Sequence, residues 1–597
     1  MILNYIRNKH LHRFILSALI FLCLEFVFSW LLTGTISFRY ERKSLLLSAV
    51  VSALIVNFYP PRNYKISLWL PLVIAVSSLS IRPLSGESVS PAECYQYIGL
   101  FTGIYGFLFL IYLFLPQSSI RKFYLVFTLF LFLLPAGLLW FYYILSGSWP
   151  HADTVMAVLQ TNPAEAWSYM KDHFHWIGIL CTLVILGAFY FFCRHLLTGG
   201  LPIIYDRHTR YFAVASILLF LSSAILVLHA AKHSPLQQLA SETQVYVKKY
   251  NGFAENKKKR ESAINQNIQP RNTEEKGIYV LVIGESQNRL HMGAYGYDRD
   301  TTPWLSDQLN NNPDFIRFTQ AYSCHTHTVP VLTYALTAKN QYNTLSLENA
   351  VSILEVAKAA GYHTAWISNQ VQYSAWDTPI TVIASEAEQQ KWFNKNVGET
   401  TKTNFYDEKV INGINSIKKY DKMLIIVHLM GNHGSYEDRY PHNFQKFNGR
   451  GKVIDAYDNS ILYNDYVVSK IYDAVKGLPN FQGMVYFSDH TDAVDQGLAH
   501  DASSFVYPMT YIPLYMFFSP NYIHQYGKTF QTLKSHSDSC FTNDLIFNTM
   551  LGIMHIQTDS IDEPNNDLTA DTYDATPSRF RTLYGKKEIQ PIKDPQN

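Results

Sequence analysis

The sequence predicts a helical membrane domain followed by a layered α/β domain. Long apolar runs recur up to residue 231, and the composition turns polar from residue 232 onward. Beyond residue 276, short β-rich runs alternate with helical patterns, which is typical of a sheet covered by helices. We therefore divide the 597-residue chain into a transmembrane domain at 1–231, a linker or interfacial segment at 232–276 and a globular domain at 277–597.

The charge balance argues against nucleic-acid binding. The chain carries 49 Lys and Arg residues against 47 Asp and Glu residues, which leaves a formal net charge of only +2. A nucleic-acid-binding protein normally shows a clear basic excess. Charged residues make up only 16% of the chain and aromatic residues 15%, a combination that is common when about half of a protein lies in a membrane.

The first half contains enough apolar sequence for several membrane spans. A helix that crosses the bilayer needs about 20 mostly apolar residues. Two shorter runs, 45–58 and 66–81, are either a sixth and a seventh span or a hairpin that enters the bilayer partway. Either count is odd, so the two ends of the domain face opposite sides of the membrane. Five runs meet the length requirement: 14–34, 97–115, 123–146, 174–194 and 210–231.

Basic residues give the orientation of these spans, because they concentrate in cytoplasmic loops. The 82–96 and 147–173 loops are then periplasmic, as is everything after residue 232. The basic 35–44 loop argues against this assignment. The first apolar run is long and lacks a small-residue cleavage site, so we interpret it as an anchor. The residues that mark the cytoplasmic side are Arg7, Lys9, Arg13, Arg121, Lys122, Arg194, Arg207 and Arg210.

Two segments next to the membrane each have two interpretations. The 147–173 loop is either a pair of interfacial helices that help present a lipid or a loop that packs on the globular domain. The 232–276 segment is either a solvated tether or a contact with anionic lipid headgroups. Its basic character comes from Lys248, Lys249, Lys257, Lys258, Lys259 and Arg260.

The globular domain shows near-continuous apolar strands, which predict a sheet covered on both faces. A helical pattern runs over 456–476, and Gly477 follows it as a C-cap. In open sheets of this kind, ligands bind beyond the carboxyl ends of the strands. The expected strands are 278–283, 363–367, 423–428, 483–487 and 511–518.

Polar residues that suit a metal follow three of these strands. Glu285 follows the first, and Asp489 and His490 follow the fourth. The third ends at His428 and runs on to His433, and His500 lies eleven residues beyond Asp489. Zinc accepts mixed oxygen and imidazole ligands, so this set predicts a Zn²⁺ site. A single carboxylate at a strand end would equally serve as a helix N-cap.

The segment from Ser323 to Pro330 supplies candidate nucleophiles. Pro330 suits the first turn of a helix, which places Thr328 at a helix N-terminus. Free N–H groups at such a terminus attract phosphate, and a threonine beside Zn²⁺ can act as a nucleophile at neutral pH. Taken alone, Thr328 would be read as an N-cap, and Thr326 is a rival nucleophile.

Several motifs together resemble those of the phosphoethanolamine transferases, which belong to the alkaline phosphatase and sulfatase superfamily. The opening signature is Gly284-Glu285-Ser286-Gln287-Asn288-Arg289, followed by similar matches at 292–297 and 301–304. The resemblance covers the soluble half and is nearer in style to enzymes that modify the lipopolysaccharide core than to those that act on lipid A. It continues through 361–362, 368–370, 428–434, 457–465, 488–490 and 500–501.

This resemblance implies an α/β/α sandwich of alkaline phosphatase/sulfatase type and a set of site residues. Thr328 resembles the nucleophile, and His433 and His500 resemble histidines on the substrate side. Asn349, in the helix after the nucleophile, loosely resembles an asparagine that contacts substrate. The implied zinc ligands are Glu285, Thr328, Asp489 and His490.

The implied reaction moves phosphoethanolamine from phosphatidylethanolamine to a lipopolysaccharide, on a core sugar or on lipid A, through a covalent threonine intermediate. The protein would then lie in the inner membrane of a Gram-negative bacterium, with its catalytic domain in the periplasm. Phosphoglycerol transfer, or hydrolysis of a phosphate or sulfate ester, would suit the same fold. A non-catalytic membrane scaffold is the remaining alternative.

The chain departs from the family pattern at two places. Thr491-Asp492 stands where the family usually has Gly-Glu, and Tyr334 stands where the lipid A enzymes have a second cysteine. Cys324 and Cys540 are the only cysteines of the soluble half. In an oxidising periplasm they would form a disulfide, or they are two buried free thiols.

Overall fold

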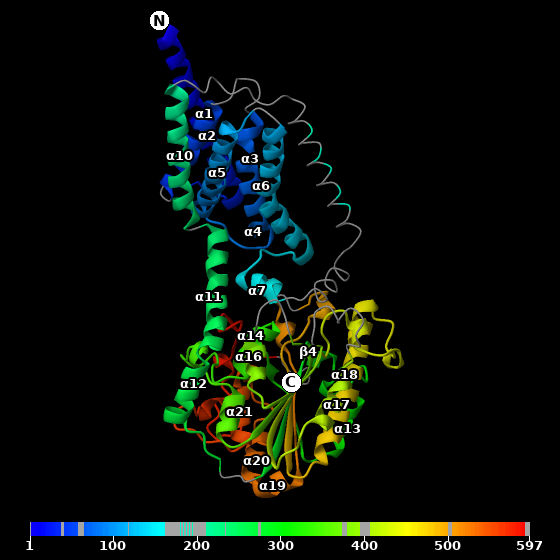
Figure 1. The fold of residues 1–597 in the computed structure, drawn as a ribbon. Helices are drawn as coiled ribbons and strands as arrows, with labels where there is room; N and C mark the ends of the chain where they lie inside the picture. Colours follow the sequence, from blue (N-terminus) through cyan, green and yellow to red (C-terminus); the bar gives the residue numbers. More distant parts are fainter. Residues whose placement is uncertain are drawn as a thin grey trace. The chain divides into compact units, whose positions relative to one another are not determined.

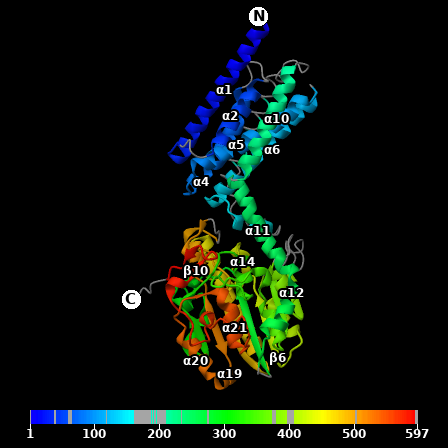
Figure 2. The ribbon, with the colours of Figure 1, turned by 90° about the vertical axis from the view of Figure 1, so that its left-hand side faces the viewer.

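The computed structural model describes residues 2–36, 41–57, 65–116, 119–160, 210–232, 234–272, 276–372, 379–394, 406–499 and 504–591, with isolated positions between 180 and 194. The chain forms two compact units, an N-terminal helical unit and a C-terminal α/β unit (Figures 1 and 2). The second unit takes in the chain from Val245 onward and also the segment that begins at Thr154.

The N-terminal unit consists of helices. Four of them, α1, α5, α6 and α10, are long and apolar enough to cross a membrane, which confirms four of the five expected spans. The fifth, 174–194, lies outside the described residues except for isolated positions. Helices α2 and α3 have 16 and 15 residues, hence lengths of about 24 and 22 Å, short of a bilayer core of about 30 Å. The helices are α1 (Ile2–Thr33), α2 (Arg42–Asn57), α3 (Lys65–Leu79), α4 (Ile81–Leu84), α5 (Pro91–Phe114), α6 (Ser119–Ser146) and α10 (Arg210–Ala231).

Helix α5 is the centre of this unit. It contacts α1, α2, α3, α6 and α10, and a capping box between Ser90 and Glu93 sets its start. Two of its glycines lie against α10: a Cβ added to Gly103 would be 2.7 Å from a Val227 methyl carbon, and one added to Gly106 would be 2.2 Å from the Ser223 hydroxyl. Small residues therefore let the two helices approach closely, as in other membrane bundles.

A seven-stranded sheet organises the C-terminal unit. The order is β2-β8-β7-β1-β6-β4-β5, with β7, β1, β6, β4 and β5 parallel and β8 antiparallel to both of its neighbours. The five expected strands are confirmed, although the last begins at Leu514, not at residue 511; β2 and β5 were not anticipated. The strands are β1 (Gly277–Gly284), β2 (Phe315–Phe318), β4 (His363–Val371), β5 (Gln389–Asn394), β6 (Lys422–His428), β7 (Phe481–Ser488) and β8 (Leu514–Phe518).

Both faces of the sheet are covered, which confirms the α/β/α sandwich. Strand β1 sends Tyr279, Leu281 and Ile283 into one apolar core, and its alternate residues into the other. Figure 1 shows the two helical layers on either side of the strands. One core includes α14 (Thr328–Ala335), α15 (Ile353–Ala359), α16 (Pro379–Ser385) and α21 (Ile546–Ile553); the other includes α13 (Pro303–Asn311), α17 (Lys409–Ser416) and α18 (Lys452–Lys476), which ends at Gly477 as expected.

The remaining elements of the C-terminal unit are short. Strand β3 pairs in parallel with β9, and β10 pairs with β11 in an antiparallel ladder. The β3–β9 ladder joins the chain just before α14 to the C-terminal part of the unit. The elements are β3 (Ala321–Tyr322), β9 (Phe541–Thr542), β10 (Arg581–Thr582), β11 (Lys587–Glu588), α19 (Pro520–Gln525) and α20 (Gly527–Ser535).

The segment expected as a linker is helical, and part of it belongs to the α/β unit. It forms α11 (Pro235–Glu255) and α12 (Lys257–Ala263). The five lysines are exposed as expected, but Phe253 and Arg260 are buried. Arg260 pairs with Glu355 and Glu386, each at 3.0 Å. From residue 245 the solvated-tether interpretation is therefore wrong, because apolar residues at helical spacing dock this stretch on the core.

The 147–173 loop begins with helix α7 (Ala152–Gln160). Met156 is 8% exposed and belongs to the apolar core of the α/β unit. This stretch therefore packs on the globular domain, the second of the two interpretations. The second expected helix of the loop lies outside the described residues.

Candidate metal centre and nucleophile

Adjacent parallel strands bring the predicted ligands together. Gly284, the last residue of β1, is in register with Ser488, the last residue of β7. The residues that follow, Glu285 on one strand and Asp489 on the other, therefore leave the sheet side by side. Strand β6 flanks β1 on its other side, with His428 in register with Ile283. Strand pairing alone thus gathers three chain segments at one edge of the sheet.

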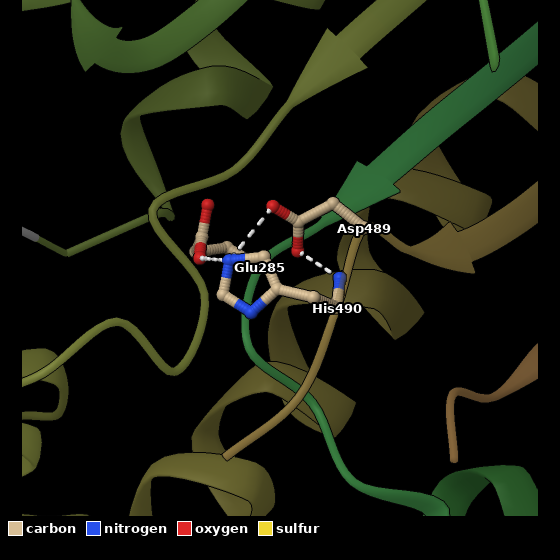
Figure 3. A group of neighbouring side chains, drawn as sticks. All are labelled: Glu285, Asp489 and His490. Carbon is tan, nitrogen blue, oxygen red and sulfur yellow. Dashed lines mark hydrogen bonds and ion pairs between the residues drawn. The ribbon is translucent and has the colours of Figure 1, made fainter. Parts of the chain in front are cut away.

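Glu285, Asp489 and His490 form a buried triad (Figure 3). The potential ligand atoms of the three side chains all lie within 4.8 Å of one another. His490 Nε2 is 3.2 Å from Glu285 Oε1 and 3.3 Å from Asp489 Oδ2. None of the three residues is more than 1% exposed.

The donor set of the triad fits a divalent metal. Burial, reinforced by the Glu285 charge, raises the pKa of Asp489 to about 7. Asp489 Oδ2 accepts no hydrogen bond from the described residues, whereas Oδ1 accepts from the Ser286 and His490 backbone N–H groups. A divalent cation would relieve the repulsion between two buried carboxylates. Two carboxylates, an imidazole and a nearby hydroxyl are ligands that zinc accepts.

The hydroxyl next to the triad belongs to Thr328. It is the first residue of α14, where His327 takes the N-cap position. Its Oγ1 lies 3.1 Å from Glu285 Oε2 and 3.2 Å from His490 Nε2. The Thr326 hydroxyl instead contacts the ring of its neighbour His327, at 3.1 Å from Nδ1. The geometry therefore favours Thr328 over Thr326 as the nucleophile.

His433 lies on a turn that is locked to Glu285. Leu429 N–H donates to Ile283 O at 3.0 Å, and Asn432 N–H donates to Glu285 O at 2.9 Å. Gly431 has φ +51°, and a Cβ there would be 2.7 Å from Glu285 O. Only glycine fits this approach, and the partly exposed His433 follows it by two residues.

His428, by contrast, is a core residue. Its side chain is buried at the end of β6 and meets the Trp366 ring edge-on, with the ring centroids 5.9 Å apart. Burial lowers the pKa of His428 to about 3. The imidazole is therefore neutral, and it stands apart from the triad.

Asp407 holds the same turn and was not anticipated. Its buried carboxylate accepts the backbone N–H groups of Met430 and Gly431, both at 2.8 Å, and Asn369 Nδ2 at 2.9 Å. Burial raises the pKa of Asp407. It lies just before α17, beside Glu408, and no sequence pattern relates it to a turn more than twenty residues later.

Asp492 replaces the glutamate of the family pattern and has a supporting contact. The Tyr436 hydroxyl donates to Asp492 Oδ2 at 2.6 Å, and Asn288 Nδ2 donates to the Asp492 carbonyl at 3.1 Å. Tyr436 follows His433 by three residues. The Asp492 carboxylate therefore supports the turn that carries His433 and is not a member of the triad.

Two predicted substrate residues have other outcomes. Asn349 lies in a short 3₁₀ helix, Leu347–Asn349, and its amide donates to the Ser346 hydroxyl at 2.7 Å. Its expected place in the helix after the nucleophile is wrong, because α14 ends at Ala335 and the chain becomes α-helical again only after Ser352 caps α15. His500 lies outside the described residues.

Cys324 and Cys540 are free, buried thiols, which confirms the second interpretation of this pair. Parallel pairing of β3 with β9 sets Ala321 opposite Phe541. Cys540 therefore lies opposite Gln320, and Cys324 lies four positions further along the chain. Cys540 thus comes before this short ladder, and Cys324 lies beyond its other end.

The α/β unit has counterparts among known proteins. Residues 278–556, which form most of this unit, match the family model described as Sulfatase. Among individual proteins, the chain is similar to phosphoethanolamine transferase EptC of Escherichia coli strain K12, with 28% identity over 390 residues. That alignment covers 59% of this chain and 66% of EptC, so the chain spans just under two thirds of this relative.

The chain is also similar to solved structures, among them a periplasmic domain and an integral membrane protein. The C-terminal periplasmic domain of E. coli EptC, in complex with Zn, is 27% identical with a TM-score of 0.50, and the match covers 54% of this chain and 94% of that one. The integral membrane protein lipooligosaccharide phosphoethanolamine transferase A of Neisseria meningitidis is 20% identical with a TM-score of 0.56. It covers 87% of this chain and 98% of its own, so both units of the chain have counterparts in one known fold.

Proposed function

We propose that this protein transfers phosphoethanolamine from phosphatidylethanolamine to a lipopolysaccharide, through a covalent intermediate on Thr328. The observation that carries the proposal is the Thr328 hydroxyl, which opens a helix and touches two members of a buried triad of metal-ligand type. The names of the relatives, phosphoethanolamine transferase and lipooligosaccharide phosphoethanolamine transferase, support the choice of group and of acceptor class.

The proposed cofactor is Zn²⁺, held by Glu285, Asp489, His490 and Thr328. The E. coli EptC domain, a relative with the same fold, was solved with Zn. When bound, zinc would lower the pKa of a ligand hydroxyl and offset negative charge on phosphoryl oxygens.

The residues of the chain divide the reaction between them. Thr328 Oγ1 loses its proton and attacks the donor phosphorus; the Oγ1–P bond forms, the bond from phosphorus to the diacylglycerol oxygen breaks, and that oxygen takes up a proton. An acceptor oxygen then loses its proton and attacks the same phosphorus; the Oγ1–P bond breaks, and Thr328 Oγ1 takes up a proton. N–H groups at the start of α14 attract the phosphoryl oxygens. His433 and His500 orient the group or carry protons. Asn349, whose amide donates a hydrogen bond to Ser346, keeps only the loosely implied role of a substrate contact.

The domain arrangement follows from the substrates. Both are membrane lipids, and four helices of the chain are long and apolar enough to cross a membrane. We place the protein in the inner membrane of a Gram-negative bacterium, with the Sulfatase-family domain in the periplasm. In that position the domain reaches a lipid donor and a lipid acceptor from the same side.

The test compares Thr328→Ala, Thr328→Ser and Thr326→Ala in cells without the native gene, by mass spectrometry of lipopolysaccharide. Thr328→Ala should abolish the modification, and Thr326→Ala should retain it. Loss in Thr326→Ala with retention in Thr328→Ala would reverse the assignment. Glycerol phosphate on the acceptor would indicate phosphoglycerol transfer, and free phosphate alone would indicate ester hydrolysis.

Metal content tests the ligand set separately. Alanine at Glu285, Asp489 or His490 should each reduce the zinc bound to the purified full-length protein, because each change leaves an incomplete site. Full occupancy in all three variants would rule out the site. A wild-type protein that purifies without zinc and stays inactive when zinc is added would support a non-catalytic scaffold.

A further inference from the structure

Asn543 lies at the junction of the nucleophile segment and the metal-ligand strand. Strands β3 and β9 pair with Tyr322 opposite Thr542, so the next residues, Ser323 and Asn543, leave the ladder together. Asn543 opens a short 3₁₀ helix, Asn543–Leu545, against which α14 packs. Its side chain is fully buried.

Both the oxygen and the nitrogen of the Asn543 side-chain amide form hydrogen bonds. Oδ1 accepts the backbone N–H of Cys324 at 2.9 Å. Nδ2 donates to the Asp489 carbonyl at 2.6 Å, with the Ser488 carbonyl at 3.3 Å. The Ser323 hydroxyl also lies 3.3 Å from Nδ2 and 2.6 Å from the same Asp489 carbonyl. One side chain thus joins the segment that leads to Thr328 with the residue that carries a metal-type carboxylate.

We propose that Asn543 is a positioning residue that fixes Thr328 against Asp489, and this inference rests on the proposed function. Cys324 precedes Thr328 by four residues, and Asp489 is itself a member of the triad. The amide holds the two backbones by hydrogen bonds whose directions are fixed by its planar geometry. It makes the connection between the nucleophile segment and the C-terminal part of the domain that a Cys324–Cys540 disulfide would have made.

Burial makes this connection stiff. Ser323, Cys324, Ser488, Asp489 and Asn543 are all fully buried, so no solvent is at hand to replace a lost bond. Without the amide, the Cys324 N–H and the Asp489 carbonyl would each lose a partner, and the two segments would separate or twist. The expected effects are misalignment of Thr328 and weaker zinc binding. The side chains that would touch substrate are themselves unchanged by the substitution.

The test uses two substitutions in the full-length, zinc-loaded protein. Asn543→Ala removes the amide, and Asn543→Leu restores most of its volume with neither donor nor acceptor. We expect kcat per folded molecule to fall about 100-fold in both with KM nearly unchanged, since a misplacement of about 1 Å costs this much. Zinc affinity, measured by competition with a chelator, should fall about 10- to 100-fold, as is usual when a partner of a metal ligand is removed.

Asn548→Ala is the matched control, because it removes another buried amide, 5% exposed, five residues further along the same segment. Its kcat and zinc affinity should match those of the wild type. Wild-type kcat in Asn543→Leu would reduce the role of Asn543 to filling space, and unchanged kcat and zinc affinity in both variants would overturn the inference. A wild-type protein that transfers no phosphoethanolamine would defeat the proposed function instead, and zinc affinity would still decide the role of Asn543.

Discussion

Replacing Gly431 by alanine should damage the site through the backbone alone. The residue has φ +51°, and a Cβ there would lie 2.7 Å from Glu285 O and 2.8 Å from Glu285 N. Ordinary contact begins near 3.4 Å, so Glu285 or the turn must move by about 0.7 Å. The left-handed conformation costs a non-glycine residue about 1–2 kcal/mol, and forced packing adds about 1–3 kcal/mol. The free energy of unfolding should therefore fall by about 2–5 kcal/mol.

Gly431→Ala should also slow catalysis in the molecules that stay folded. Glu285 is a proposed metal ligand that also touches Thr328 Oγ1, so a displacement approaching 1 Å should lower the transfer rate up to about 100-fold. The assay is phosphoethanolamine transfer by purified full-length protein, normalised to the folded fraction, together with zinc affinity.

Two other glycines serve as controls that distinguish the contact with Glu285 from the cost of a left-handed backbone conformation. Gly434 lies on the same turn with nothing within 4 Å of an added Cβ, and Gly585 has φ +86° in open space. Gly434→Ala should behave as the wild type, and Gly585→Ala should lose stability without losing activity. If Gly431→Ala were as active as Gly434→Ala and kept its zinc, the contact with Glu285 would have no bearing on the site.

Three further predictions concern a pH dependence, a hydrogen bond and two thiols. Burial raises the pKa of Asp465 to about 7, above its unfolded value of about 3.9, so its contribution to the unfolding free energy is fully present below about pH 4 and is lost as pH rises through about 7. Asp465→Asn should flatten the decline of Tm between about pH 4 and 7, and parallel wild-type and variant profiles would contradict this. Tyr436→Phe removes the hydrogen bond to Asp492 and should lower kcat while leaving Tm nearly unchanged. A kcat equal to that of the wild type would show that the turn that carries His433 does not need this hydrogen bond. Because Cys324 and Cys540 are free, reductant should leave Tm unchanged, and both thiols should be alkylated after denaturation without reductant; protection of either would reveal a bond.

The triad could be predicted because each member follows directly after an apolar strand. Glu285 comes after β1, and Asp489 and His490 come after β7. Parallel neighbours in a sheet end at the same edge, so sequence position alone indicates proximity. Thr328 was found for a related reason, since a helix start is visible in the sequence as a change of pattern before Pro330.

The supporting residues could not be found in this way. Asp407 and Asn543 belong to no periodic pattern, and each hydrogen-bonds to a segment that only the folded chain brings near. Asp407 reaches the turn at Met430 and Gly431, and Asn543 reaches Cys324, more than 200 positions earlier. Asp and Asn are common residue types, so only the hydrogen-bond partners in the folded chain reveal that these two residues support the site.

The linker shows how a count of charges can mislead. Six basic residues favoured a solvated segment, yet Tyr246, Tyr250 and Phe253 stand at helical spacing and pack on the core of the α/β unit. That spacing was visible in the sequence and indicates an amphipathic helix. The burial of Arg260 was not visible, because its partners Glu355 and Glu386 lie about 100 or more positions away.

The exposure of the site residues restricts how a lipid can reach them. Glu285, Asp489 and His490 are at most 1% exposed, whereas Thr328 and His433 are partly exposed. A donor therefore meets the Thr328 hydroxyl first, with the triad behind it. Phosphoryl transfer places the attacking and leaving oxygens roughly in line, so in the proposed reaction the leaving oxygen would lie on the side of the phosphorus away from Thr328. Of the two histidines proposed for the substrate side, His433 is the one that the structure describes, and it is partly exposed; we propose it as the group that protonates the departing lipid.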